Sequence, residues 1–369
     1  MALLETGNGV PGAGGQPRGE YRRAAAKSRA AGPKPKPRVA LRPRIAWRRL
    51  AAPAWGPARA RVPRAPGGRV TIRLGLAQIE PALGLPDRNL DLHLAAIEAA
   101  RAQRLDLLLF PELSLTGYLL KDLVPEIARP WPDPFFAPLV EASRTLDLAF
   151  GFVERGEGLL SHNSLAYLSG GRLLHLHRKA YLPTYGMFDE QRFFAAGDGL
   201  QAFPTRFGRL ALLICEDLWH PSMPYLAFLD GALGLLVASA SPLRGLEGSA
   251  AGGLPANAEF WDDLLRHHAR QYAGFIAFCN RCGVEDGSSY WGGSRLVGPE
   301  GTLVAAGPLH APALVSAELD LAAVARRRRD FALLRDERPE LVFRALERIL
   351  RRRAGNPDAE TQVPGSVVR

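Results

Sequence analysis

The sequence has few cysteines and no long apolar run. Its 369 residues include three cysteines, too few for the disulfide framework of a small secreted domain. No stretch approaches the roughly 18–20 consecutive apolar residues that a membrane-spanning helix needs. The first residues also lack the hydrophobic region of a secretory signal peptide. These absences argue against disulfide-rich and membrane-spanning classes and predict a protein of the reducing cytoplasm.

Sequence signals for a bound metal or cofactor are also missing. Cys279 and Cys282 form a C-x-x-C pair, but a four-ligand zinc site needs a second pair or a histidine cluster. The sequence offers neither, although His267 and His268 lie nearby in the chain. We therefore interpret the pair as core residues. Since no Gly-rich nucleotide loop occurs either, we expect no metal and no cofactor.

The net charge of +10 belongs to the N-terminal segment. Residues 1–69 hold 16 Lys and Arg but only two acidic residues, Glu5 and Glu20. This segment is rich in Ala, Arg, Pro and Gly without apolar periodicity, which predicts disorder. One hypothesis is a polybasic tail for nucleic acid or a membrane surface, and another is an organelle transit peptide. A third is a mis-assigned gene start, with translation beginning at Val70.

The body of the chain, residues 70–355, alternates strand and helix patterns, and residues 356–369 are expected to be a flexible tail. Expected helices are 88–104, with Asp87 as a candidate N-cap, 134–146 and 260–272. Expected strands are 70–79, 105–110, 147–153, 164–168, 172–177, 201–204, 209–215, 233–238, 275–279, 294–297, 303–306 and 313–317. Hairpins among these elements predict a mixed-sheet α/β layer fold rather than a parallel barrel. Residues 241–257 are expected to form a long loop, of the kind that often covers an active site.

Three residues at the ends of expected strands could together perform acyl transfer. They are Glu112, Lys179 and Cys215. Taken singly, each has an ordinary explanation, since a buried Cys is usually a small hydrophobe and a Glu or Lys after a strand is usually solvated. Together they suit a nucleophile, because a thiol with a pKa of about 8.5 needs a base or a cation beside it. Their spacings of 67 and 36 residues mean that they can meet only through the tertiary fold.

The segments around these residues resemble a known family. They are similar to the Glu, Lys and Cys motifs of the nitrilase, or carbon–nitrogen hydrolase, superfamily, and read PELSLTGY at 111–118, RKAYLP at 178–183 and ICED at 214–217. Further matches are Asn280-Arg281, Gly292-Gly293-Ser294 and Pro299-Glu300-Gly301. The resemblance covers about residues 70–320. It implies an α/β fold, the αββα sandwich in which two mixed sheets are flanked by helices.

Within that superfamily the chain is similar to the glutaminase domain of glutamine-dependent NAD synthetases. The similarity lies in YLPTYGMFDE at 181–190 and CEDLW at 215–219. The ATP-binding domain of those enzymes, with its Ser-Gly-Gly-x-Asp-Ser loop, has no counterpart here. Ser169-Gly170-Gly171 lacks that continuation and is interpreted as a hairpin turn. The chain alone is therefore not expected to make NAD, but to release ammonia from an amide, or to do so for a separate synthetase.

The resemblance also implies a role for each site residue. Cys215 would attack the amide carbonyl, while Glu112 takes the thiol proton, protonates the departing ammonia and then activates the water that cleaves the thioester. Lys179 and the backbone N–H of Glu216 would hold the oxyanion, and Glu190 would position the substrate and the triad. Candidate walls of the substrate pocket are Tyr118, Tyr185, Phe188 and Trp219, although aromatic residues beside strand ends are more often ordinary core.

The sequence thus predicts a cofactor-independent, glutaminase-like amidohydrolase acting on a small-molecule amide. Alternatives with the same triad are a nitrilase, an N-carbamoyl amidase, or a glutaminase subunit that supplies ammonia to a separate NAD synthetase. The resemblance also implies a homo-oligomer, and no membrane partner is expected. A rival from another class is a catalytically silent protein that binds nucleic acid through residues 1–69. That rival does not explain why all three reactive residues are present.

Overall fold

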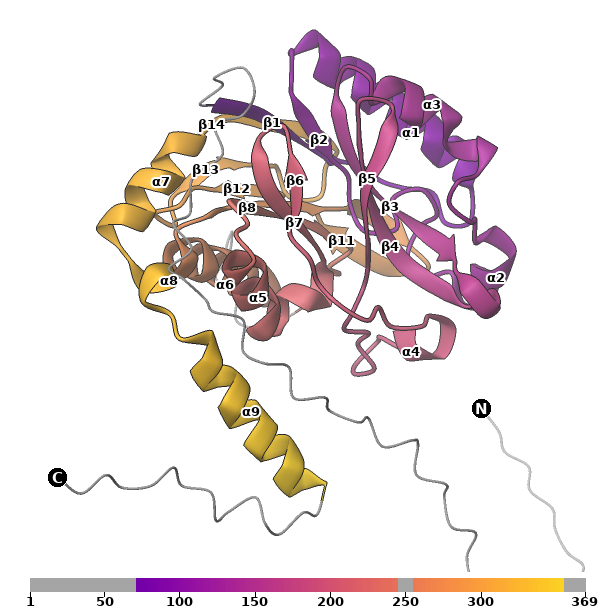
Figure 1. Cartoon of the computed structure of the whole chain (residues 1–369). Coiled ribbons are helices and arrows are strands. Elements are labelled where there is room, and N and C mark those ends of the chain that lie inside the picture. The colour runs from indigo at the N-terminus through magenta and orange to yellow at the C-terminus, as the bar shows by residue number, and fades with distance from the viewer. Residues whose placement is uncertain (1–70, 245–254, 355–369) are drawn as a thin grey trace, which may run out of the picture. The chain divides into compact units, whose positions relative to one another are not determined.

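The computed structural model describes residues 71–244 and 255–354. The predicted leader, the predicted tail and most of the predicted loop 241–257 lie outside the described residues. In the described part, two six-stranded sheets pack face to face and helices cover their outer faces (Figure 1). This arrangement confirms the predicted αββα sandwich with mixed sheets.

The first sheet has the strand order β14-β1-β2-β3-β4-β5. Its strands are β1 (Thr71–Gln78), β2 (Leu107–Leu109), β3 (Asp147–Arg155), β4 (Ser161–Ser169), β5 (Arg172–Arg178) and β14 (Ala313–Asp320). The pairs β1–β2 and β2–β3 are parallel, and the other pairs are antiparallel. Parallel strands point their carboxyl ends to one edge, so the residues after them gather there.

The second sheet has the strand order β13-β12-β9-β8-β7-β6. Its strands are β6 (Phe203–Thr205), β7 (Gly208–Ile214), β8 (Gly234–Ser239), β9 (Phe275–Asn280), β12 (Arg295–Val297) and β13 (Leu303–Ala306). Strands β7, β8 and β9 are parallel. A separate hairpin of β10 (Cys282–Glu285) and β11 (Ser288–Trp291) was not predicted.

Alternation along β7 shows how the sequence builds the layers. Leu210, Leu212 and Ile214 belong to the core between the two sheets, whereas Ala211 and Leu213 pack on the helix side. Successive side chains of a strand point to opposite faces, so a strand that is apolar at every position can fill both layers. Burying each such side chain contributes about 1.5–3 kcal/mol, which favours the sandwich over an exposed sheet.

The outer layers contain two main helices each. Helices α1 (Pro86–Ala102) and α3 (Ala137–Ala142) cover the first sheet, and α5 (Ser222–Leu229) and α6 (Ala256–Tyr272) cover the second (Figure 1). The remaining helices are η1 (Lys121–Leu123), α2 (Val124–Ile127), η2 (Pro134–Phe136), η3 (Glu157–Leu159), α4 (Glu190–Phe193), η4 (Cys215–Trp219), α7 (Leu321–Asp330), α8 (Leu333–Asp336) and α9 (Pro339–Arg353). None of the helices in the described ranges is long and apolar enough to cross a membrane.

The structure corrects some of the predicted boundaries. Leu85 is the N-cap of α1, and the predicted cap Asp87 lies in the first turn, because Pro86 takes the first helical position. The predicted helix 134–146 is shorter and splits into η2 and α3. Helix α5 was not predicted, because its sequence SMPYLAFL is apolar on all sides and has no helical periodicity.

Candidate active site

The residues predicted as the triad come together at the carboxyl ends of three strands. Glu112 follows β2, Lys179 follows β5 and Cys215 follows β7. The Lys179 Nζ atom lies 2.7 Å from Glu112 Oε1. At the end of β8, the Ser239 hydroxyl donates to the Cys215 sulfur at 3.4 Å, and the next N–H, of Ala240, donates to Glu112 Oε2 at 2.8 Å. One dipeptide therefore holds the thiol and the carboxylate side by side.

The turn that carries Glu112 is shaped by close packing on β3. A Cβ atom at Gly151 would lie 2.4 Å from the Leu113 nitrogen, so only glycine allows the turn to approach β3 this closely. Leu113 itself takes a positive φ of 47°, a strained conformation for a branched residue. Below the turn, His93 Nε2 lies 2.9 Å from the Ser114 hydroxyl. These contacts fix the direction of the Glu112 carboxylate.

The turn that carries Cys215 is equally constrained. Cys215 has a positive φ of 44° and starts the helix η4, so its thiol sits on a sharp strand-to-helix turn. The fully buried Asp217 carboxylate accepts hydrogen bonds from the N–H groups of Ile214 and Ala180, both at 3.0 Å. His177 Nε2 lies 2.8 Å from the same carboxylate. Asp217, which the sequence analysis did not single out, thus ties the Cys215 turn to the loop after Lys179.

The charges at the centre of the site are buried and shared. Lys179 Nζ also lies 2.6 Å from Glu190 Oε1, and the Tyr118 hydroxyl donates to that oxygen at 2.5 Å. Burial lowers the pKa of Lys179, but the carboxylates of Glu112 and Glu190 outweigh it and hold the pKa well above its ordinary range. Burial raises the pKa of Glu190 to about 7, against the lowering effect of Lys179. The ammonium therefore stays charged between two acidic side chains.

The Cys215 thiol keeps its proton in this environment. Burial raises its pKa well above the ordinary value, and the Glu112 charge adds to the increase, while Lys179 and Ser239 oppose it. A thiol that keeps its proton needs a base in order to attack a carbonyl, and the Glu112 carboxylate could take this proton. Glu216 lies in the first turn of η4, where backbone N–H groups have no intrahelical acceptor. The predicted role of this N–H group, as a donor to an oxyanion, stays a prediction.

Ser239 gives a first testable prediction. Ser239→Ala removes the hydroxyl that donates to the Cys215 sulfur, so the thiolate loses one hydrogen bond that favours it. We expect the pH profile of Cys215 alkylation to move to higher pH and kcat to fall about tenfold, the effect of one neutral-to-charged hydrogen bond of about 1.5 kcal/mol. Mass spectrometry after timed alkylation measures the profile. An unchanged profile would mean that the hydroxyl does not act on the sulfur.

Three of the four predicted pocket aromatics lie around the triad. The Tyr118 hydroxyl donates to Glu190. The Phe188 ring packs edge-on against the rings of Tyr118 and Tyr185, with centroid distances of 6.4 and 5.8 Å. The half-exposed Tyr185 donates to a Glu216 carboxylate oxygen at 2.9 Å. Trp219 lies apart from this group. Its ring stacks on Phe260 at 4.4 Å and meets Trp261 edge-on, both on α6.

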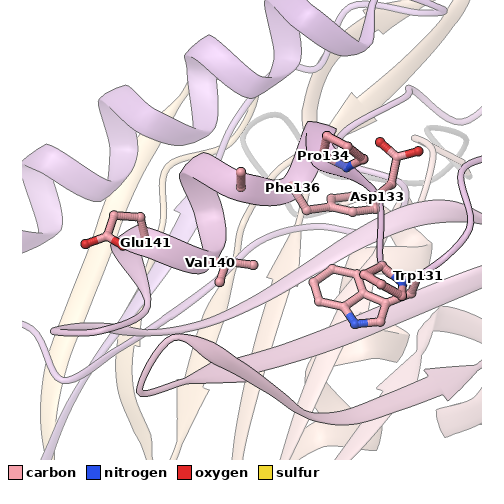
Figure 2. A pocket seen from close by; sticks show the side chains of 8 residues that line it. Trp131, Asp133, Pro134, Phe136, Val140 and Glu141 are labelled. Carbon is pink, nitrogen blue, oxygen red and sulfur yellow. The ribbon is translucent and has the colours of Figure 1, made fainter.

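The hollows on the surface of the described residues include two that bear on the site or on its exclusion elsewhere. One, of about 620 Å³, lies beside the Cys215 turn and is lined by Ala180, Tyr181, Leu182, Pro183, Thr184, Tyr185, Gln191, Phe194, Ala196, Glu216 and His220. The other, of about 550 Å³, is apolar and lies at α3 around Trp131, Phe136 and Val140 (Figure 2). The acidic residues of the second hollow, Asp133 and Glu141, form ion pairs with arginines. It therefore offers no free reactive group.

The residues of the C-x-x-C pair are free thiols with different surroundings. Cys279 is buried in the core between the sheets, and Cys282 is buried at the start of β10. Within 71–244 and 255–354 no group of three or more His, Cys, Asp or Glu side chains could hold a metal ion. The prediction of core positions agrees with this burial.

Curated relatives are similar in sequence to this chain over most of its length. A glutamine-dependent NAD(+) synthetase of Thermotoga maritima is 31% identical over 255 residues, which are 68% of this chain and 42% of that protein. The corresponding enzyme of Xanthomonas campestris is 31% identical over 241 residues, or 63% of this chain and 41% of that protein. The chain thus spans less than half the length of these relatives.

Solved structures include both synthetases and amidases. The glutamine-dependent NAD+ synthetase of Acinetobacter baumannii, solved with ADP, is similar with a TM-score of 0.61 and 27% identity, over 69% of this chain and 46% of that one. An amidase from Nesterenkonia sp. AN1, which carries the acetamide moiety of fluoroacetamide at its active site cysteine, has a TM-score of 0.62 and 26% identity, over 75% of this chain and 97% of that one. Residues 73–329 match the carbon–nitrogen hydrolase family. The chain therefore belongs to the carbon–nitrogen hydrolase family of the nitrilase superfamily and is an enzyme of that kind.

Proposed function

We propose that this enzyme hydrolyses a carboxamide through a Cys215 thioester and releases ammonia. The observation that carries the proposal is the buried contact of Lys179 with Glu112, 2.7 Å apart, directly beside the Cys215 thiol. A base, a cation and a nucleophile that share one small space are the groups that acyl transfer requires. Their burial strengthens each electrostatic interaction.

The geometry supports a two-stage reaction. Glu112 takes the thiol proton as the Cys215 sulfur bonds to the amide carbon. The oxyanion accepts hydrogen bonds from the Lys179 ammonium and the Glu216 backbone N–H group. Each such donor contributes about 3–4 kcal/mol. The carbon–nitrogen bond then breaks, and Glu112 returns the proton to the leaving ammonia. In the second stage Glu112 takes a proton from water, the hydroxide cleaves the thioester, and the thiol recovers its proton.

Charges at the mouth of the site support an amino-acid amide as the substrate. Among residues 71–244 and 255–354, the Glu216 carboxylate has no Lys or Arg partner, and its neighbours are Tyr185 and His220. The Arg244 guanidinium lies over the Phe188 ring at 4.9 Å and has no carboxylate partner in the same ranges. A substrate with an ammonium and a carboxylate, as in glutamine, would pair with both. A simple nitrile would leave both unpaired.

A second candidate function is ammonia supply to a separate synthetase. The chain covers 42% of the Thermotoga maritima glutamine-dependent NAD(+) synthetase, a relative whose name joins the use of glutamine to the synthesis of NAD(+). Ammonia released from glutamine by this chain would then serve a synthetase. Stimulation of glutamine hydrolysis by an added ammonia-dependent synthetase would support this role over a metabolic amidase.

The test is ammonia release by the full chain from glutamine, asparagine, short carboxamides, N-carbamoyl amines and nitriles, with Cys215→Ala as the control. We expect release from a carboxamide, with glutamine preferred, and none from the control. Release from nitriles alone, or from N-carbamoyl amines alone, would replace the proposal by the corresponding alternative. A trapped acyl adduct on Cys215, seen by mass spectrometry after acid quenching, would identify the thioester.

A further inference from the structure

Tyr290 on β11 has a buried hydroxyl without a partner. Its side chain is 0% exposed, and its oxygen makes no hydrogen bond in the described part of the chain. Buried polar groups are almost always paired, because an unmade hydrogen bond costs free energy. An unpaired buried hydroxyl beside a catalytic site therefore points to a ligand.

The Tyr290 ring is held rigidly. The Arg281 guanidinium lies over it at 4.2 Å, and Tyr118 meets it edge-on at 6.4 Å. Arg281 is paired with the buried Glu285 carboxylate, which also accepts the N–H of Tyr118 at 2.9 Å. The backbone of Tyr290 forms an isolated antiparallel β-bridge with that of Pro242. With ring and backbone both fixed, the hydroxyl has a defined direction, as a specificity residue needs.

Tyr290 packs against residues that hold the acidic groups of the site. Its ring meets that of Tyr118, whose hydroxyl donates to Glu190 Oε1 at 2.5 Å. Lys179 bonds Glu112 Oε1, whereas Oε2 accepts the N–H of Ala240, which packs in the same apolar cluster as Tyr290. Burial raises the pKa of Tyr290, with smaller contributions from several charges, among them those of Glu112 and Cys215. The Tyr290 ring thus packs beside Tyr118 and in the same cluster as Ala240, whose contacts run to Glu190 and Glu112.

The proposed reaction indicates which group of the substrate would lie against the Tyr290 hydroxyl. Lys179 and the Glu216 N–H group take the carbonyl oxygen, so the amide nitrogen must lie toward Glu112, which protonates it. We propose that Tyr290 is a specificity-determining residue whose hydroxyl accepts a hydrogen bond from the leaving –NH2 group of a primary amide. The inference rests on the proposed function. A nitrile nitrogen has no N–H to donate, so the same hydroxyl favours amides over nitriles.

The test uses Tyr290→Phe, which removes one oxygen and keeps the ring. Since that oxygen has no partner among the described residues, the variant should unfold at the same temperature as the wild type or higher. The matched control is Tyr167→Phe. Tyr167 is also fully buried, but its hydroxyl donates to Asp147 at 2.8 Å, so this variant should lose stability and keep its amide preference.

The probes are iodoacetamide and iodoacetonitrile, which report on recognition without hydrolysis. In both, the sulfur–carbon bond forms as the carbon–iodine bond breaks, iodide leaves, and the thiol proton passes to Glu112. Rates on Cys215, measured by mass spectrometry, are divided by the rates of each reagent with free glutathione. We expect the normalised preference of the wild type for iodoacetamide to fall about 3- to 10-fold in Tyr290→Phe, the effect of one neutral hydrogen bond.

Each outcome decides the matter. A lower preference for iodoacetamide in Tyr290→Phe, with unchanged stability, supports the role of Tyr290. If no amide in the panel is hydrolysed, the proposed function fails, but this result for Tyr290 stands. An unchanged preference in Tyr290→Phe overturns the inference, while amide hydrolysis by the wild type leaves the proposed function standing. Equal slowing with both reagents and a lower unfolding temperature would assign Tyr290 a structural role and overturn it too.

Discussion

Cys215→Ala should lower ammonia release by roughly 10⁴-fold or more, since a covalent mechanism has no substitute for its nucleophile. The change removes one sulfur atom at a partly exposed position, so the free energy of unfolding should change by less than about 1 kcal/mol. Activity against the amide identified in the panel and a urea unfolding curve measure the two effects. Activity near that of the wild type would exclude the thioester mechanism.

Cys279→Ala is the matched control for this prediction. Cys279 is 0% exposed in the core between the sheets, so its loss leaves a small cavity that costs about 1 kcal/mol or more. Its sulfur has no role in the reaction, and kcat should stay within about twofold of the wild type. Cys215→Ala should thus lose activity and keep stability, whereas Cys279→Ala should lose stability and keep activity. Loss of activity in both variants, with neither destabilised, would contradict this prediction.

The sequence could predict the centre of the site because each central residue follows a recognisable strand. Leu105 to Phe110, apolar apart from Asp106, and Leu210 to Ile214 are runs that a reactive residue follows closely. The pattern thus predicted the positions of the three residues at strand ends. Their meeting also depends on the stacking of the sheets, since Glu112 and Lys179 follow strands of the first sheet and Cys215 follows a strand of the second.

The supporting contacts could not be predicted in the same way. Ser239 and Ala240 follow a pattern that reads only as a buried strand. Ser239 contacts Cys215 at the end of the neighbouring strand β7, whereas the Ala240 contact with Glu112 crosses to the other sheet. Besides its local bond from Ile214, Asp217 accepts hydrogen bonds across 36 or more residues of chain, from the loop after Lys179. No periodicity encodes such pairings, because they arise from packing between layers.

The hairpin that carries Tyr290 had a signal that was missed. Asp286-Gly287 is a dipeptide typical of two-residue hairpin turns, and both residues take positive φ, of 45° and 78°. The flanking residues are too polar to look like strands. Trp219 follows Cys215 closely in sequence, and its ring contacts Phe260 and Trp261 of α6. Its place in a substrate pocket stays a prediction.

Lys179→Met should reduce kcat by roughly 10³-fold and should also destabilise the fold. The substitution keeps the length of the side chain but leaves Glu112 and Glu190, both buried, without their shared cation. Removing one partner of a buried ion pair costs about 3–5 kcal/mol. Urea unfolding at pH 7 measures the loss. The matched control is Lys121→Met, since the Lys121–Asp286 pair is exposed on both sides and should contribute about 0–1 kcal/mol.

The pH dependence of this loss provides a sharper test than its size. Lys179 lowers the pKa of Glu190, which burial nevertheless raises from 4.5 to about 7, so Lys179→Met should raise that pKa further. A raised folded-state pKa gives stability that is present below the unfolded value of about 4.5 and is lost as pH rises through the folded value. The stability gap between wild type and variant should therefore widen as pH rises from about 7 toward 8, where Glu190 ionises in the folded wild type but not in the folded variant. A gap that stays constant over this range would mean that Lys179 acts through packing rather than charge, and the role of its ammonium in balancing the two carboxylates would have to be abandoned.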